Sequence, residues 1–127
     1  YPQIPEMETF AAYLARYCFT TALRRHAGRL KYYYGPLGRK KTLEGRDLTY
    51  VKALFGTGGI LSRSRFARQI LDPVRSLAKQ YPNELLPSAD VKVFRDQHYL
   101  FAPIGVLSTI DEEGAERLLR TSIQELE

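Results

Sequence analysis

Apolar residues recur at three- and four-residue steps near the start of the chain, after an opening that contains two prolines. This spacing is typical of an amphipathic helix, because one helical turn takes about 3.6 residues. It predicts a long helix from about Glu6 or Thr9 to about Leu30. Its apolar side is expected to consist of Phe10, Leu14, Tyr17, Thr21 and Ala22.

A mostly apolar run of strand-forming residues spans Val51 to Phe55. The run predicts a buried strand that is covered on both faces, since such a strand need not alternate apolar and polar residues. It leads directly into Gly56, Thr57, Gly58 and Gly59. A helix is expected next, with Ser62 or Ser64 at its N-cap.

The second half of the chain predicts further short elements. A helix is expected from Arg65 to Lys79, kinked or divided by Pro73, with Phe66, Ile70, Val74 and Leu77 on its buried side. A loop should follow over 81–90, and it should turn Leu85 and Leu86 inward.

The last third of the chain alternates, then turns helical. Val91 to Phe94 predicts a short strand that ends at Arg95-Asp96, and 99–107 favours a short helix. A final helix opens at 110–113, and its inner face should hold Ala115, Leu118, Leu119, Ser122 and Ile123. This order predicts an α/β fold in which helices pack on a few short parallel strands. So thin a sheet suggests a missing partner or a homodimer mate.

Composition limits the possible classes of protein. With 127 residues, the chain fits a single domain at 1–127, and no apolar run approaches the roughly 20 residues of a membrane span. Because the chain starts without Met, we interpret it as a fragment of a longer protein. The single cysteine, Cys18, favours a reducing cytoplasm, and Cys18, His26 and His98 lack metal-ligand spacing.

The net charge of +5 is concentrated between Arg24 and Arg46, around three consecutive tyrosines. Basic residues mixed with aromatic ones can bind nucleic acid, but no recognised nucleic-acid-binding motif accompanies them, so the sequence disfavours that partner. The simpler interpretation is a solvated helix end. It would be followed by an exposed, mobile connection from Gly35 to Gly45.

The glycine turn at 56–59 admits two interpretations. A strand, a glycine turn and a helix start together form a common phosphate or nucleotide site, because helix N–H groups then point at the anion. The glycine spacing matches neither the dinucleotide fingerprint nor the P-loop. The alternative is a tight strand-to-helix turn packed against a neighbour.

Several segments occur together in one order along the chain: Arg25-His26-Ala27-Gly28-Arg29, Glu44-Gly45-Arg46-Asp47-Leu48-Thr49, Leu54-Phe55-Gly56-Thr57-Gly58-Gly59, Leu85-Leu86-Pro87, Asp96-Gln97-His98-Tyr99 and Gly105-Val106-Leu107-Ser108. This set resembles the C-terminal part of the glutamate mutase accessory family, the MutL/GlmL type. That family is unrelated to the mismatch-repair protein with a similar name. The resemblance covers nearly the whole chain from about Phe10.

The resemblance implies a fold and a cofactor. The family belongs to the superfamily of actin, sugar kinases and Hsp70, whose members hold ATP between two ribonuclease H-like lobes. This chain would be the C-terminal portion of one lobe, with 54–62 as its adenosine loop. Gly56, Thr57, Gly58, Gly59 and Ser62 would then line the nucleotide, and Arg25 and Arg29 would lie near the adenine.

The same resemblance implies a helper role. Full-length members would bind ATP or ADP with magnesium, but the fragment lacks the acidic phosphate loop and so is expected to bind neither by itself. Its partners would be the subunits of an adenosylcobalamin-dependent mutase, which the helper would free of damaged cobalamin as a chaperone-like reactivating factor. Whether the full-length protein is an ATPase stays open. The rival interpretation is a non-catalytic interaction domain with a degenerate cleft, which docks a partner enzyme through 35–45.

Overall fold

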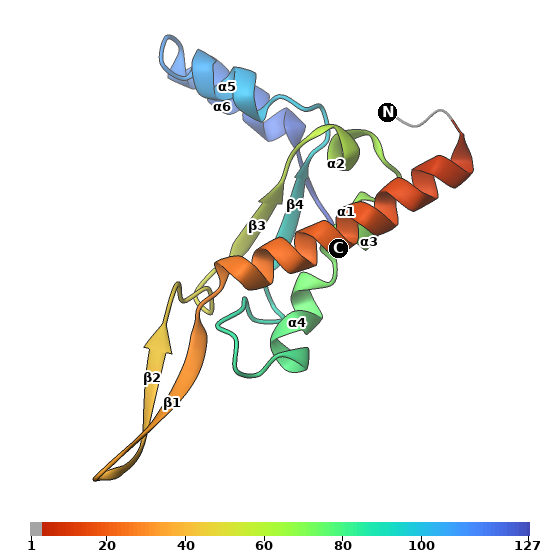
Figure 1. Ribbon diagram of the computed structural model, residues 1–127. Helices are drawn as coiled ribbons and strands as arrows, with labels where there is room; N and C mark the ends of the chain where they lie inside the picture. The colour runs from red at the N-terminus through yellow and green to blue at the C-terminus, as the bar shows by residue number, and fades with distance from the viewer. Residues whose placement is uncertain (1–3) are drawn as a thin grey trace.

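A computed structural model describes residues 4–127 as a mixed α/β fold with two small sheets (Figure 1). The elements in chain order are α1 (Pro5–His26), β1 (Arg29–Gly35), β2 (Gly38–Glu44), β3 (Ala53–Gly56), α2 (Gly59–Arg63), α3 (Ala67–Leu71), α4 (Val74–Gln80), β4 (Lys92–Asp96), α5 (Phe101–Leu107), α6 (Glu112–Ser122) and β5 (Ile123–Glu125). The predicted α/β class is confirmed. Its place in a ribonuclease H-like lobe stays a prediction.

The central sheet has three strands in the order β3-β4-β5. The predicted parallel pair is present, with β3 and β4 in register from Ala53 opposite Lys92 to Gly56 opposite Arg95. The short strand β5 was not predicted, and it runs antiparallel to β4. The core on one face of this sheet contains Ala12, Ile70, Leu71, Val74, Val91 and Val93.

The strand β3 differs from its prediction in one respect that bears on the site. It begins at Ala53 rather than Val51, and it is not covered on both faces. Leu54 packs against the core, whereas the side chain of Phe55 on the opposite face is 51% exposed. The sequence could not show this, because an apolar run does not reveal which of its faces has a covering layer within the chain.

The helix α1 is present, but the predicted inner face is wrong. Phe10 and Tyr17 are 70% and 69% exposed, and the helix instead turns Ala12, Ala15, Phe19 and Leu23 toward the core. Both faces carry apolar residues, so periodicity alone favoured the bulkier stripe. The face that contains Ala12 and Ala15 is the buried one, because alanines let the helix lie close against α3. The helix also ends at His26, four residues before the predicted end.

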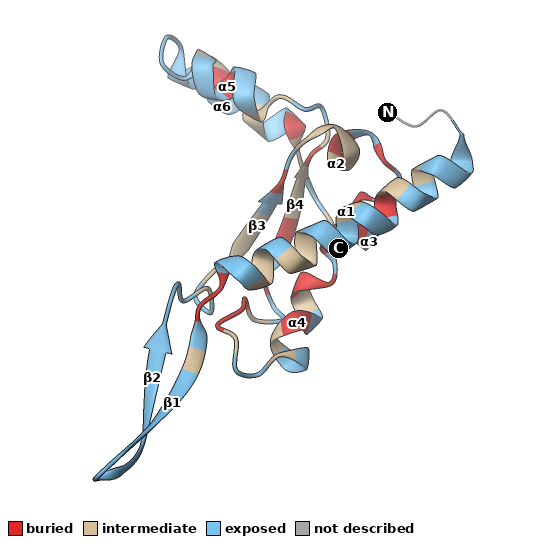
Figure 2. Cartoon of the chain, in the orientation of Figure 1, coloured by how far each residue is buried: buried red, intermediate tan, exposed pale blue. Residues whose placement is uncertain are grey.

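The segment predicted to be a mobile connection is a β-hairpin. Strands β1 and β2 pair antiparallel from Arg29 opposite Glu44 to Gly35 opposite Gly38, and nearly every residue in them is exposed (Figure 2). Two features of the sequence explain the hairpin. Tyrosines favour strands, and Gly38 has a φ of +98°, a left-handed conformation that glycine adopts readily at a hairpin turn.

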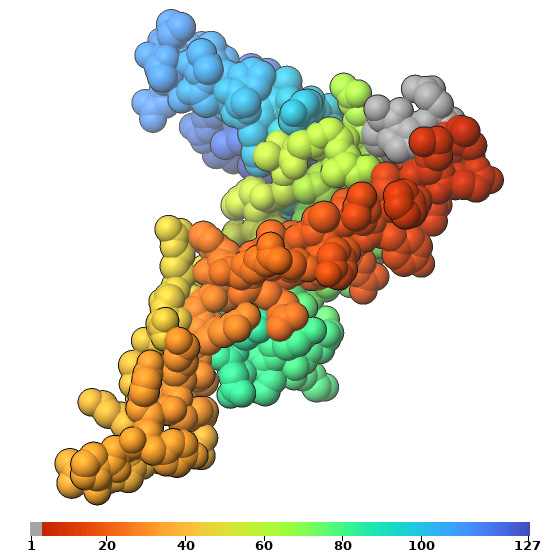
Figure 3. All heavy atoms as spheres, in the orientation of Figure 1, coloured from red at the N-terminus to blue at the C-terminus, as the bar shows by residue number. Residues whose placement is uncertain are grey.

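The remaining helices follow the sequence in part. On the predicted inner face of α6, Ala115 and Ser122 are buried, but Leu118 is 43% exposed and Ile123 lies in β5. Pro73 separates α3 from α4, and Leu85 and Leu86 are buried as expected. The side chain of Asp111 caps α6 by accepting the Gly114 N–H at 2.9 Å. The helices α5 and α6 pack against each other and project at one end of the molecule, while the β1–β2 hairpin projects at the other (Figure 3). No helix within residues 4–127 is long and apolar enough to cross a membrane.

Candidate functional site

The candidate site lies where the two parallel strands end. The strand β3 runs into the glycine turn at 56–59, and its neighbour β4 ends at Asp96. Ligands of α/β proteins bind outside the carboxyl ends of parallel strands, because the loops that follow those strands meet there. The turn and Asp96 therefore occupy the edge of the sheet where a ligand site is expected.

The three glycines of the turn have different surroundings. Gly56 is buried, and a Cβ added there would lie 2.7 Å from Leu71 Cδ1 and 2.8 Å from Leu61 Cδ1. A Cβ added at Gly58 or Gly59 would meet nothing within 4 Å, and Gly58 has a φ of +107°. The packed-turn interpretation therefore describes Gly56, whereas Gly58 and Gly59 present open backbone that a ligand can approach.

The side chain of Asp96 is fully buried and joins the turn to two other segments. One of its oxygens, Oδ2, accepts the Thr57 hydroxyl and the Phe101 N–H, each at 2.9 Å. The other, Oδ1, accepts the Leu100 N–H at 2.9 Å and a short hydrogen bond from the Ser122 hydroxyl. The carboxylate thus holds the turn against the start of α5 and the end of α6.

The electrostatics of Asp96 favour its charged form. Burial by itself would raise the pKa of this carboxyl, because the charged form is penalised away from water. The hydrogen bonds from Ser122, from the backbone of Leu100 and Phe101, and from Thr57 outweigh that penalty. They hold the pKa of Asp96 below its ordinary value of 3.8.

The two serines expected at the helix start have other partners. The Ser62 hydroxyl donates to the Asp96 backbone carbonyl at 2.5 Å, so Ser62 links α2 to β4 and does not cap α2. Ser64 accepts the Phe66 N–H at 3.0 Å in the turn between α2 and α3, so it is the N-cap of neither helix. The helix α2 itself has only 5 residues, so the helix-dipole argument for an anion is weak here.

An aromatic cluster lies beside the turn, on the uncovered face of the sheet. The rings of Phe55 and Phe94 are stacked with centroids 4.9 Å apart and an interplanar angle of 14°. Phe101 tilts toward Phe55 at 6.3 Å. The half-exposed ring of Phe55 adjoins the glycine turn, so a flat apolar surface and bare backbone lie next to each other.

The structure does not bring Arg25 and Arg29 to the turn. The end of α1 and the start of β1, which carry them, lie toward the start of β3, whereas the turn follows the other end of β3 (Figure 1). Arg29 approaches Glu84 at 3.5 Å, and Arg25 is exposed near the end of α1. Their role near an adenine stays a prediction that the geometry of this chain does not support.

Sequence reasoning did not predict two parts of this site: the carboxylate of Asp96 and the ring of Phe55. The sequence predicts Asp96 as the end of a strand and as part of a segment that resembles the family, but it gives Asp96 no role in a site, because its partners lie 4, 5, 26 and 39 residues away. The only available signal was an acid at the end of one parallel strand, level with the glycines after the other. Within residues 4–127, no group of three His, Cys, Asp or Glu residues is placed to hold a metal ion.

Comparison with known proteins places the chain in a family. The model of the MutL protein family matches residues 1–123. Protein MutL of Clostridium tetanomorphum is 28% identical over 119 residues, which make up 94% of this chain and 25% of that protein. The chain therefore spans a quarter of the length of this curated relative. The comparison with solved structures found no significant match.

The chain belongs to the MutL protein family, because the family model covers nearly all of it. The resemblance that the sequence motifs indicated is thereby confirmed.

Proposed function

We propose that this chain supplies the adenosine side of an ATP site in an accessory protein that serves an adenosylcobalamin-dependent mutase such as glutamate mutase. The full-length protein would hold ATP or ADP with magnesium between this portion and the rest of the polypeptide. Nucleotide binding would shift the balance between open and closed arrangements of the protein. It can do so only if the two arrangements bind nucleotide with different affinity.

The observation that carries the proposal is the open backbone at Gly58 and Gly59, at the carboxyl end of a parallel strand. A nucleoside needs a close approach to the backbone, and glycine alone leaves that space free. The Thr57–Asp96 hydrogen bond of 2.9 Å fixes the turn beforehand, which reduces the entropy that binding must overcome. Membership of the MutL family adds the expectation of a mutase partner.

The test is a calorimetric titration of the full-length protein with ATP. Gly59→Asp introduces a side chain and a negative charge where the backbone is open, so we expect ATP affinity to fall by about tenfold or more, which is about 1.4 kcal/mol. Gly105→Asp is the matched control, because Gly105 also faces open space but lies in α5. Unchanged ATP binding in Gly59→Asp would remove the turn from the site.

The same titration decides the rival interpretation, a scaffold with a degenerate cleft. Such a protein would show neither heat nor a shift in melting temperature on addition of ATP or ADP. A second assay addresses the helper role by following the release of damaged cobalamin from the mutase. Release that depends on both the accessory protein and ATP supports the proposal.

A further inference from the structure

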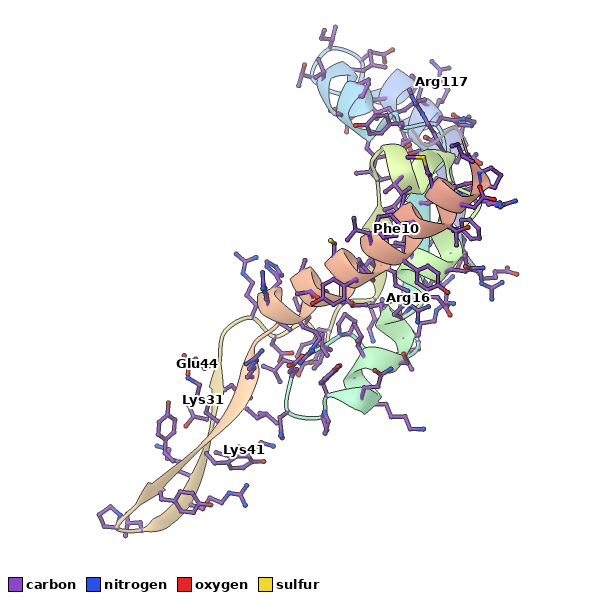
Figure 4. The ribbon with its side chains drawn as sticks, turned by 45° about the vertical axis from the view of Figure 1, so that its right-hand side comes forward. Phe10, Arg16, Lys31, Lys41, Glu44 and Arg117 are labelled. Atoms are coloured by element: carbon purple, nitrogen blue, oxygen red, sulfur yellow. The ribbon has the colours of Figure 1, made fainter. Side chains whose placement is uncertain are left out.

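The β1–β2 hairpin, which we name the arm (residues 29–44), stands away from the rest of the molecule. Figure 4 shows Lys31 and Glu44 nearer its base and Lys41 further toward its tip, with no other element beside them. All its residues are exposed except Leu30, which is half-buried. Both outer strand edges lack a neighbouring strand in the described part of the chain. A two-stranded ribbon without a covering layer is only marginally stable in water.

The arm is strongly cationic. Residues 29–44 contain five Lys or Arg side chains and one acidic residue, Glu44. Lys31 is paired with Glu44 at 2.5 Å, and the guanidinium of Arg39 lies 3.7 Å from the centre of the Tyr32 ring. Lys40 and Lys41 have no ion-pair partner within residues 4–127. Their charges are therefore available to an acidic partner.

The tip of the arm is apolar. Leu37 is fully exposed at the turn after Pro36, and Tyr34 beside it is 82% exposed. Leucine cannot stack on a base as an aromatic ring can, but it fits an apolar recess in a protein. Tyrosine and arginine are enriched among the residues that dominate protein–protein binding energy. The combination favours a protein partner over a nucleic acid.

The base of the arm is fixed on the body. The Gly28 N–H donates to the Arg46 carbonyl at 2.6 Å, and the Leu30 N–H donates to the Asn83 carbonyl at 2.8 Å. Below them Glu84, whose side chain is 8% exposed, accepts two hydrogen bonds from Arg24 at 2.7 and 2.8 Å. Because its base is fixed, the arm has a defined direction before it binds a partner, which lowers the entropy lost on binding.

We propose that the arm inserts into an acidic groove of a partner protein. Lys40 and Lys41, on opposite faces of the ribbon, would meet carboxylates on the two walls of the groove, and Leu37 would enter an apolar recess. Only the choice of partner rests on the proposed function, which makes the mutase the protein to probe.

The experiment measures binding of the full-length protein to the purified mutase by surface plasmon resonance. The double charge reversal Lys40→Glu with Lys41→Glu tests the charged contacts of the arm. The single substitution Leu37→Ser tests its apolar contact. The matched control reverses two other exposed cations, Arg68→Glu with Lys79→Glu, for the same change in net charge. The urea unfolding midpoint of each variant shows whether it is folded.

We expect each arm variant to weaken mutase binding about tenfold or more and the control to bind like the wild type. Binding should also weaken as salt rises, and more steeply for the wild type than for the double reversal. Arm variants should keep their ATP affinity, and Gly59→Asp should keep its mutase binding, so the two proposals can fail separately.

Three results would overturn the proposal that the arm docks onto a partner protein. The first is that both arm variants bind the mutase as the wild type does. The second is that the wild type fails to bind the mutase at all. The third is that a single-stranded DNA oligonucleotide, used as a second probe, is retained through Lys40 and Lys41 while the mutase is bound elsewhere.

Discussion

The buried carboxylate of Asp96 holds together three segments that are distant in sequence. Replacement by Asn keeps the shape but removes the charge and puts an NH2 group in place of one oxygen, so that it faces either the Leu100 N–H or the Phe101 N–H. We expect the free energy of unfolding to fall by about 2–3 kcal/mol, because a buried donor loses its acceptor. Urea unfolding of the chain measures it. Asp90→Asn, at an exposed loop residue, should change little.

The lowered pKa of Asp96 also predicts a pH dependence of stability. A carboxyl whose pKa is lower in the folded state stabilises the fold above its unfolded value of about 3.8, and that contribution is lost as pH falls through the folded pKa. Stability of the wild type should therefore drop below about pH 4. The Asp96→Asn variant should show a smaller drop in the same urea series. An equal drop in both proteins would exclude Asp96 as its source.

Gly28 is the residue on which the base of the arm depends. A Cβ there would lie 2.7 Å from the Glu44 carbonyl oxygen, which is backbone and cannot move aside cheaply. Gly28→Ala should lower the free energy of unfolding by about 1–3 kcal/mol through overpacking. Gly35→Ala is the control, because a Cβ there meets nothing within 4 Å. Equal midpoints for the two variants in urea would contradict this close approach.

At the scale of elements, α1 offers a direct test of which face is buried. Leu23 packs against the core, whereas Leu14 is 52% exposed. Leu23→Ala should lower the free energy of unfolding by about 1–2 kcal/mol, less than for a fully buried leucine because Leu23 is partly buried, and Leu14→Ala should change the urea midpoint little. A larger loss at Leu14 than at Leu23 would restore the face that periodicity predicted.

The elements that sequence predicted well are those whose limits are set locally. Pro73 has no backbone N–H to donate, so it separates α3 from α4 whatever its tertiary surroundings. Asp47 also acts locally: it accepts the Thr49 N–H at 2.9 Å and stabilises the turn before β3. The elements that sequence predicted poorly are those that depend on distant neighbours. The inner face of α1 and the strand β5 belong to this group. The hairpin does not, because its tyrosines and the turn at Gly38 are local signals.

The candidate site divides in the same way. The glycine turn could be predicted because the conformational freedom of glycine belongs to the residue itself and does not depend on distant neighbours. Asp96 and Phe55 were not, because their roles arise only when β3 and β4 lie side by side. Only the resemblance placed Arg25 and Arg29 near a nucleotide, and the end of α1 and the start of β1 that carry them lie toward the other end of β3 (Figure 1).

At the scale of the whole molecule, the arm and the central sheet differ in charge and in how far other elements cover them. The arm is cationic and has no layer beneath it, whereas the parallel strands lie against a packed core. Amide hydrogen exchange should therefore be fast beyond the base of the arm and slowest in β4. Mass spectrometry of exchanged peptides measures this. Protection of 32–42 as strong as that of 92–96 would show that the arm is covered.

The account rests on the claim that a purine nucleotide lies against the open backbone of the glycine turn. Photolabelling of the full-length protein with 8-azido-ATP, followed by mass spectrometry of the labelled peptides, tests that claim most directly. The account predicts an adduct on 53–62 or on 94–101, the segments around the turn and its aromatic cluster, and competition by unlabelled ATP. Competable labelling confined to other parts of the protein would contradict it.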